Sequence, residues 1–163
     1  MMPRAGNAGV RLRSVTLQDS QAWYEIRNDQ MVRNWSRSTK VIRINEHAKW
    51  WRESLQNDKR RLFMVEIAGQ PGKAGQVGIA RLDHRGAWTE ISLAVIPAAH
   101  GRGIGTEIVC QLIEKAAQLR WPEIGAVVNG KNARSLRIFA KLGFVMKRKC
   151  WIELRYQVKR KAV

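Results

Sequence analysis

Hydrophobic positions along the chain follow two periods, which separate predicted strands from predicted helices. Short apolar or alternating runs predict strands at residues 10–15, 62–68, 76–82, 88–96 and 124–128, and a strand pair or one bent strand at 144–158. Apolar residues spaced three and four apart predict helices at residues 17–27, 45–56, 104–119 and 132–142, with a turn of helix through 31–32. This order predicts a mixed α/β fold with early hairpins and a strand–helix–strand crossover in the second half.

The connecting segments set the expected domain limits. We expect residues 1–9 to form a flexible tail and residues 10–163 a single domain, because a chain of 163 residues buries one adequate core. Residues 36–43 are predicted to be a loop, and residues 83–86 the link between two strands. Asn45 is predicted to cap the helix that follows it.

A glycine-rich turn separates a buried strand from the long helix. Residues 99–106 read Ala-His-Gly-Arg-Gly-Ile-Gly-Thr. Backbone N–H groups at the start of a helix have no partner within the helix, and they lie at its positive end. Glycines let the backbone approach a diphosphate closely. The spacing fits neither the six-residue dinucleotide fingerprint nor the nucleotide-triphosphate loop, so the turn predicts an anion site of another kind.

A second motif follows the turn, and the pair resembles a known family. Residues 132–144 read Asn-Ala-Arg-Ser-Leu-Arg-Ile-Phe-Ala-Lys-Leu-Gly-Phe. Together with the loop at 100–105, this segment is similar to the signature of the GNAT family of acetyl-coenzyme A-dependent N-acetyltransferases. The resemblance implies the GNAT fold, with a mixed central sheet of six to seven strands, flanking helices and a splayed strand pair that holds acetyl-CoA. It implies acetyl-CoA as co-substrate, no metal, and an amine as acceptor.

The resemblance also implies the residues that bind acetyl-CoA. The main chain of Leu93, Ala94 and Val95 would contact the pantetheine arm and the acetyl group. Backbone N–H groups of the glycine turn would hold the diphosphate, and Thr106 would add a hydroxyl; Arg102 either reaches a phosphate or is solvated. These turn residues are Gly101, Arg102, Gly103, Ile104, Gly105 and Thr106. Asn132 and Phe139 occupy family positions at the same site.

Three departures from the family pattern concern the chemistry. His100 stands where Gln or Arg is usual, and we expect it to brace the loop. Phe139 replaces a tyrosine that protonates the thiolate in many members, and phenylalanine has no proton to give. Val127 stands where some members carry a glutamate base. Glu90 is then the candidate general base, with Ser92 as a weaker candidate; the alternative is a surface glutamate bonded to arginines.

Charge bears on the partner. The chain has 30 Lys and Arg residues against 13 Asp and Glu, a formal net charge of +17. Such a surface attracts anions and repels polycations, so polyamines and aminoglycosides are poor expected acceptors. Nucleotide-linked amino sugars, ribosomal proteins or acidic peptides fit better. A catalytically impaired domain that binds nucleic acid stays open, and so does a charge excess that serves solubility only.

The N-terminal third gives a further hint about the acceptor. Arg27 and Asn28, with the helix around His47, resemble a GNAT branch that acetylates a nucleotide-linked amino sugar of the pseudaminic acid pathway. Trp50 and Trp51 either stack on that acceptor or belong to the core.

Cysteine usage and hydropathy bear on the compartment. Cys110 and Cys150 lack metal-site spacing and are expected to be reduced. No segment of membrane-spanning length or secretion signal is evident, so we expect a cytoplasmic protein, with a homodimer possible.

Overall fold

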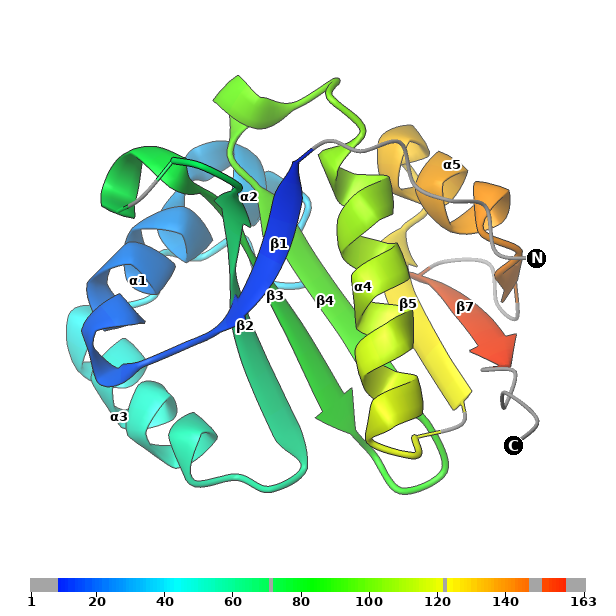
Figure 1. Cartoon of the computed structure of the whole chain (residues 1–163), viewed down its shortest axis with the longest axis horizontal. Helices are drawn as coiled ribbons and strands as arrows, with labels where there is room; N and C mark the ends of the chain where they lie inside the picture. Colours follow the sequence, from blue (N-terminus) through cyan, green and yellow to red (C-terminus); the bar gives the residue numbers. More distant parts are fainter. Residues whose placement is uncertain (1–8, 71, 122, 147–150, 158–163) are drawn as a thin grey trace.

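The computed structural model describes residues 9–70, 72–121, 123–146 and 151–157 (Figure 1). The strands are β1 (Val10–Ser14), β2 (Arg60–Ile67), β3 (Gln76–His84), β4 (Thr89–Val95), β5 (Glu123–Asn129), β6 (Val145–Met146) and β7 (Trp151–Gln157). The α-helices are α1 (Ser20–Asn28), α2 (Gln30–Asn34), α3 (Ile44–Leu55), α4 (Ile104–Gln118) and α5 (Ala133–Lys141). Short 3-10 helices are η1 (Leu17–Asp19), η2 (Gly72–Gly75) and η3 (Pro97–Ala99). The prediction for Cys150, and nearly all of the predicted tail at 1–9, lie outside the described residues.

One mixed sheet organises the fold, as the sequence predicts. Its seven strands follow the order β1-β2-β3-β4-β5-β7-β6. β4 and β5 run parallel and are joined through α4, whereas the other neighbouring strands are antiparallel. This is the predicted strand–helix–strand crossover around the glycine turn (Figure 1).

Alternation along the strands divides the core between the two faces of the sheet. In β2, Phe63 and Val65 belong to the larger cluster, which also contains the buried stripe of α4. Leu62 and Met64 point the other way, into a smaller cluster built with α1 and α3. The period of two in the strand and of 3.6 in the helices explains this arrangement. The face under α1 and α3 is the one on which Ala94 of β4 lies.

Three predicted boundaries are wrong for local reasons. The helix predicted with Asn45 as its N-cap begins at Ile44, since Arg43 is the N-cap, two residues earlier, and the Glu46 carboxylate accepts from its backbone N–H at 3.0 Å. The predicted link at 83–86 begins later, because Asp83 and His84 still pair with β4. The first residues of the helix predicted at 17–27 form η1 rather than α-helix.

A buried histidine joins α1 to α3 and makes stability depend on pH. The His47 side chain is buried, and its Nε2 lies 2.9 Å from the Ser20 carbonyl oxygen, to which it donates. Burial lowers the pKa of His47 below its ordinary value, with the Ser20 bond acting in the opposite direction. The unfolded chain therefore takes up the proton first as the pH falls below about 6.5.

We expect the free energy of unfolding to be constant above about pH 6.5 and to fall below it, by at most about 1.4 kcal/mol per pH unit for this one proton. Urea unfolding at pH 7.5 and pH 5.5 measures the loss. The variant His47→Gln should show a smaller difference between the two pH values. An equal difference in both proteins would mean that His47 is not the titrating group.

Candidate active site

The central feature of the site is a split between two parallel strands. Among the described residues, β4 and β5 pair at Thr89 with Ile124 and at Glu90 with Gly125, and then diverge. β4 stays paired with β3 as far as Val95. The outer edge of β4 beyond Glu90 therefore offers N–H and C=O groups that no described strand uses. This is the splayed pair that the sequence resemblance implied.

The residues predicted to line the split lie on this free edge. Leu93, Ala94 and Val95 are half-buried. Leu93 and Val95 pack against the larger core cluster, while Ala94 faces α1 and α3. Main-chain groups of successive strand residues face alternate edges. The backbone N–H of Ile96 donates to the carbonyl oxygen of Val77, so Ala94 turns its main chain toward β3, whereas Leu93 and Val95 turn theirs toward the split. An extended ligand arm could pair there, as a peptide does when it adds to a sheet edge.

The glycine turn at the end of β4 presents a row of backbone N–H groups. Gly101 and Gly103 have φ angles of +78° and +76°, which only glycine adopts without strain. A Cβ built on either residue meets nothing within 4 Å, so the turn borders open space. None of the amides of residues 101–106 donates to an acceptor among the described residues. Six amides at the positive end of α4 suit a diphosphate.

The remaining turn residues have different positions. Gly105 lies against α5, because a Cβ there would be 2.7 Å from Cδ1 of Ile138. Ile104 is 2% exposed, so its side chain is core and only its amide can face a ligand. Arg102 is exposed and Thr106 half-buried in the first turn of α4. A diphosphate in the turn would be within reach of both polar side chains by sequence position.

His100 connects the turn to its neighbours. Its Nε2 donates to the carbonyl oxygen of Val95 at 2.8 Å, and its Nδ1 accepts from Nη1 of Arg134. An arginine can only donate, so this arrangement requires neutral imidazole with the proton on Nε2. His100 thus ties the end of β4 to the first turn of α5, the bracing position that we expected for it.

Two residues that the resemblance placed at the cofactor make contacts within the fold. Asn132 caps α5, since its Oδ1 accepts from the backbone N–H of Ser135 at 3.1 Å. Phe139 is 2% exposed and meets Phe144 edge-on, with ring centroids 4.9 Å apart. A side chain so fully packed has no surface for a ligand, so the assignment of Phe139 to direct cofactor contact is corrected to a core position.

The candidate base Glu90 is buried and bound to two arginines. It is 5% exposed, on the face of β4 opposite α4. Its Oε1 accepts from Nη2 of Arg37 at 2.8 Å, and its Oε2 accepts from Nε of Arg85 at 2.8 Å. Both arginine side chains are about half exposed. Of the two sequence interpretations, the arginine bonds are present, but the surface position is wrong.

A second acid–arginine group adjoins the first. Asp83 lies opposite Glu90 on β3 and forms ion pairs with Arg60 at 2.6 Å and Arg81 at 2.7 Å. Nη2 of Arg81 donates to Oγ of Ser92 at 3.3 Å. Burial lowers the pKa of Arg81, and Asp83 opposes this shift. The face of β3 and β4 beneath the predicted acceptor site therefore carries more positive than negative charge.

The sequence did not single out the arginines that surround Glu90. Arg81 and Ser92 could have been paired from strand alternation, once the register of β3 and β4 was known. Arg37 lies in the segment after α2, which crosses behind β4 (Figure 1). No periodicity marks such a contact, because it depends on the path of a loop.

The two tryptophans proposed for stacking belong mainly to the core. Trp51 is 3% exposed, and its ring lies 5.7 Å from that of Trp23. Trp50 is half-buried against Trp23 and His47. The core interpretation therefore holds for Trp51. Trp35, directly after α2, is a more exposed tryptophan, with 44% of the residue accessible.

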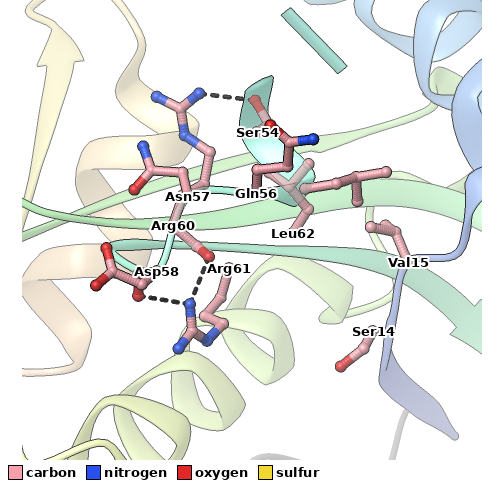
Figure 2. Close-up of a pocket in the computed structure, with 10 residues that line it drawn as sticks. Ser14, Val15, Ser54, Gln56, Asn57, Asp58, Arg60, Arg61 and Leu62 are labelled. Atoms are coloured by element: carbon pink, nitrogen blue, oxygen red, sulfur yellow. Dashed lines mark hydrogen bonds between the residues drawn. The ribbon is translucent and has the colours of Figure 1, made fainter. Parts of the chain in front are cut away.

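Figure 2 shows a shallow polar hollow away from the split. It lies between the end of β1, the end of α3 and the start of β2. Within it, Nη1 of Arg60 donates a hydrogen bond to Oγ of Ser54 at 2.7 Å. None of the predicted site residues lines it.

Two kinds of feature are absent from the described part of the chain. Within it, no helix combines the length and apolar character needed to cross a membrane. No group of three or more His, Cys, Asp and Glu side chains there could hold a metal ion.

A split strand pair with a glycine-rich turn at its end is the arrangement expected of an acetyl-CoA-dependent acyltransferase. Residues 10–145 match the family model described as the acetyltransferase (GNAT) domain, and the chain belongs to this family. Its co-substrate is acetyl-CoA, and it is an acyltransferase that acts on an amine. No curated protein matches the sequence.

Solved structures show the same fold at low identity. A spermidine N-acetyltransferase from Vibrio cholerae, solved with CoA and spermine, is 14% identical over 93% of this chain and 97% of its own, with a TM-score of 0.82. A putative phosphinothricin N-acetyltransferase is 20% identical over 93% and 99%, with a TM-score of 0.76. An aminoglycoside acetyltransferase solved with coenzyme A is 18% identical over 91% and 94%, with a TM-score of 0.74.

Proposed function

We propose that this chain transfers an acetyl group to the primary amine of a small, negatively charged acceptor, with a nucleotide-linked amino sugar as the leading candidate. The observation that carries the proposal is the ring of arginines on the acceptor face of β3 and β4. Arg37 and Arg85 bind Glu90, and Arg60 and Arg81 pair with Asp83 beside it. An acceptor with an anionic group would gain from these charges, whereas a polyamine would be repelled.

The structural relatives include enzymes whose names refer to spermidine and to aminoglycosides, which are polycationic. At 14% and 18% identity they share the fold with this chain, so their acceptors do not transfer to it. The same scaffold serves different acceptors through the side chains around the site.

Bound acetyl-CoA supplies a thioester whose acetyl carbon is already activated. The amine nitrogen forms a bond to this carbon, the carbon–sulfur bond breaks, and the thiolate takes up a proton. The main chain of Leu93 and Val95 orients the acyl arm beside the acceptor, and the amides of residues 101–106 fix the diphosphate. Positioning supplies most of the rate acceleration, because two reactants held in contact behave as if each were present at a very high effective concentration.

Glu90 is proposed to remove the proton from the acceptor ammonium through water. It lies on the acceptor face two residues before Ser92 and four before Ala94. A water molecule that donates to Oε1 of Glu90, beside the bond from Arg37, could carry a proton from a bound ammonium to this buried carboxylate. Ser92, held by Arg81, is the alternative group that orients the amine.

A panel of amines tests the acceptor class. With acetyl-CoA present, release of free thiol should be at least about tenfold faster, in kcat/KM, for a nucleotide-linked 4-amino sugar than for spermidine or kanamycin, since one well-placed ion pair contributes about 1.5–3 kcal/mol. The panel also includes an acidic peptide with a free N-terminus, which tests for a protein substrate. Faster reaction with the polycations would refute the anionic acceptor.

A total lack of thiol release with every amine would favour the binding alternative. In that case nucleic-acid affinity should fall steeply with salt. The expected cytoplasmic homodimer is a separate prediction, and light scattering of the purified chain measures its mass.

A further inference from the structure

Arg27 is a half-buried arginine that no acidic side chain neutralises. It lies in the last turn of α1, and its Nη1 is buried without a hydrogen-bond partner among the described residues. All 13 Asp and Glu residues of the sequence belong to the described part of the chain. None of them forms an ion pair with Arg27 or with its neighbour Arg33.

This contrasts with the acids nearby, which are all engaged elsewhere. Glu25 pairs with Lys73, and Asp29 caps α2 by accepting from the backbone N–H groups of Met31 and Val32. Burial lowers the pKa of Arg27, and the charge of Arg33 lowers it further. A buried donor without an acceptor is costly, and a buried charge more so, so the site favours a negative partner from outside.

Arg33 is held in a fixed position beside Arg27. Its Nε donates to the carbonyl oxygen of Asn28 at 3.0 Å, and its Nη1 donates to that of Thr39 at 2.7 Å. Asn28 in turn bonds the main chain of Ile42 in both directions, at 2.8 Å and 3.0 Å. The two arginines therefore lie on a rigid frame made by the ends of α1 and α2 and the loop at 36–43.

This frame adjoins the free edge of β4. α1 packs on β3 and β4. Ile26, directly before Arg27, is in one cluster with Ala94 and Ile96. An acceptor whose amine reaches Ala94 would therefore extend toward the end of α1. A second charged group on the same acceptor would then approach Arg27.

We propose that Arg27, with Arg33 beside it, binds the anionic group of the acceptor, a carboxylate or a phosphate. The inference rests on the proposed function and names the site that recognises the acceptor's charge. A planar guanidinium fits either group through two parallel N–H···O bonds. The buried Nη1 then gains the acceptor atom that the chain does not provide.

Binding of simple anions tests this site without the true acceptor. The protein is first saturated with CoA, which occupies the glycine turn, and is then titrated calorimetrically with uridine diphosphate as the phosphate probe and glutarate as the carboxylate probe. Whichever probe binds the wild type, we expect Arg27→Met to raise its Kd by about 10- to 100-fold, the range for the loss of one hydrogen bond to a charged group. CoA affinity should not change.

The matched control is Arg61→Met. Arg61 is also a half-buried arginine without an acidic partner, but it bonds main-chain carbonyls at the other end of the sheet. The variant Arg61→Met should leave the affinity for both probes unchanged. Arg27→Lys keeps the charge without the planar fork and should give an intermediate loss. Equal probe binding by wild type and Arg27→Met, or no binding of either probe to the wild type, would overturn the inference.

The two proposals can fail separately. If anionic amines are the better substrates but Arg27→Met leaves their KM unchanged, the subsite is wrong and the proposed function stands. If the probes bind through Arg27 but no anionic amine is acetylated, the subsite stands and the proposed acceptor class is wrong. Thermal unfolding of each variant shows whether the fold is kept.

Discussion

Valine at both Gly101 and Gly103 is expected to raise the Kd for acetyl-CoA by about 100-fold. Each residue has a φ angle near +77°, at +78° and +76°. A left-handed conformation costs an ordinary residue about 1–2 kcal/mol, and a β-branched one more. The turn would therefore adopt another conformation, and its amides would no longer point at one diphosphate. Fluorescence or calorimetric titration with acetyl-CoA measures the change.

The control carries the same strain away from the site. Gly69 has a φ angle of +80° in the turn between β2 and β3, and a Cβ there also meets nothing within 4 Å. Gly69→Val should lower stability by about half as much as the double variant, because it changes one such residue instead of two, and it should keep acetyl-CoA affinity. If the double variant binds acetyl-CoA as tightly as Gly69→Val does, the turn is not the diphosphate site.

Glu90→Gln is expected to lower kcat by about 10²- to 10³-fold while acetyl-CoA affinity stays the same, because general-base catalysis contributes about this much. The variant keeps the shape of the side chain and one acceptor oxygen, but its amide NH2 can only donate, so it accepts from Arg37 or Arg85 and not from both at their present positions. It cannot take a proton. Stopped assays of thiol release at saturating acetyl-CoA measure kcat, and calorimetric titration measures the affinity.

Glu66→Gln is the matched control for this change. Glu66 is likewise a buried glutamate bonded to two arginines, Arg11 and Arg13, but it lies in β2 at the far side of the sheet. It should lose stability as Glu90→Gln does and keep kcat. If the two variants lose activity equally, Glu90 acts by holding the loop at 36–43 rather than as a base.

The sequence predicts the cofactor side of the site better than the acceptor side. The glycine turn, the strand before it and the helix after it are close together along the chain, so period and glycine spacing suffice to find them. The split of β4 from β5 was implied by the family resemblance, and the strand register confirms it. Phe139 was misplaced because a motif position does not tell whether a side chain faces the ligand or the core.

Long-range contacts explain what the sequence could not give. Glu90 meets Arg37 across 53 positions of sequence, and the burial of Glu90 depends on that loop. Arg27 is one of 30 basic residues, and it stands out only in the structure, where it has no acidic partner and its Nη1 is buried without a hydrogen-bond partner. Net charge predicted an anionic partner in general, without indicating where on the surface the partner would bind.

The central claim is that the amides of residues 101–106 bind the diphosphate of acetyl-CoA. Calorimetry with acetyl-CoA and with acetylpantetheine, which carries the same thioester but no diphosphate, tests it most directly. We predict measurable heat with acetyl-CoA and binding weaker by about 100-fold or more with acetylpantetheine, as expected for the loss of several charged hydrogen bonds. Equal affinity for the two compounds, or no heat with acetyl-CoA on folded protein, would contradict the account.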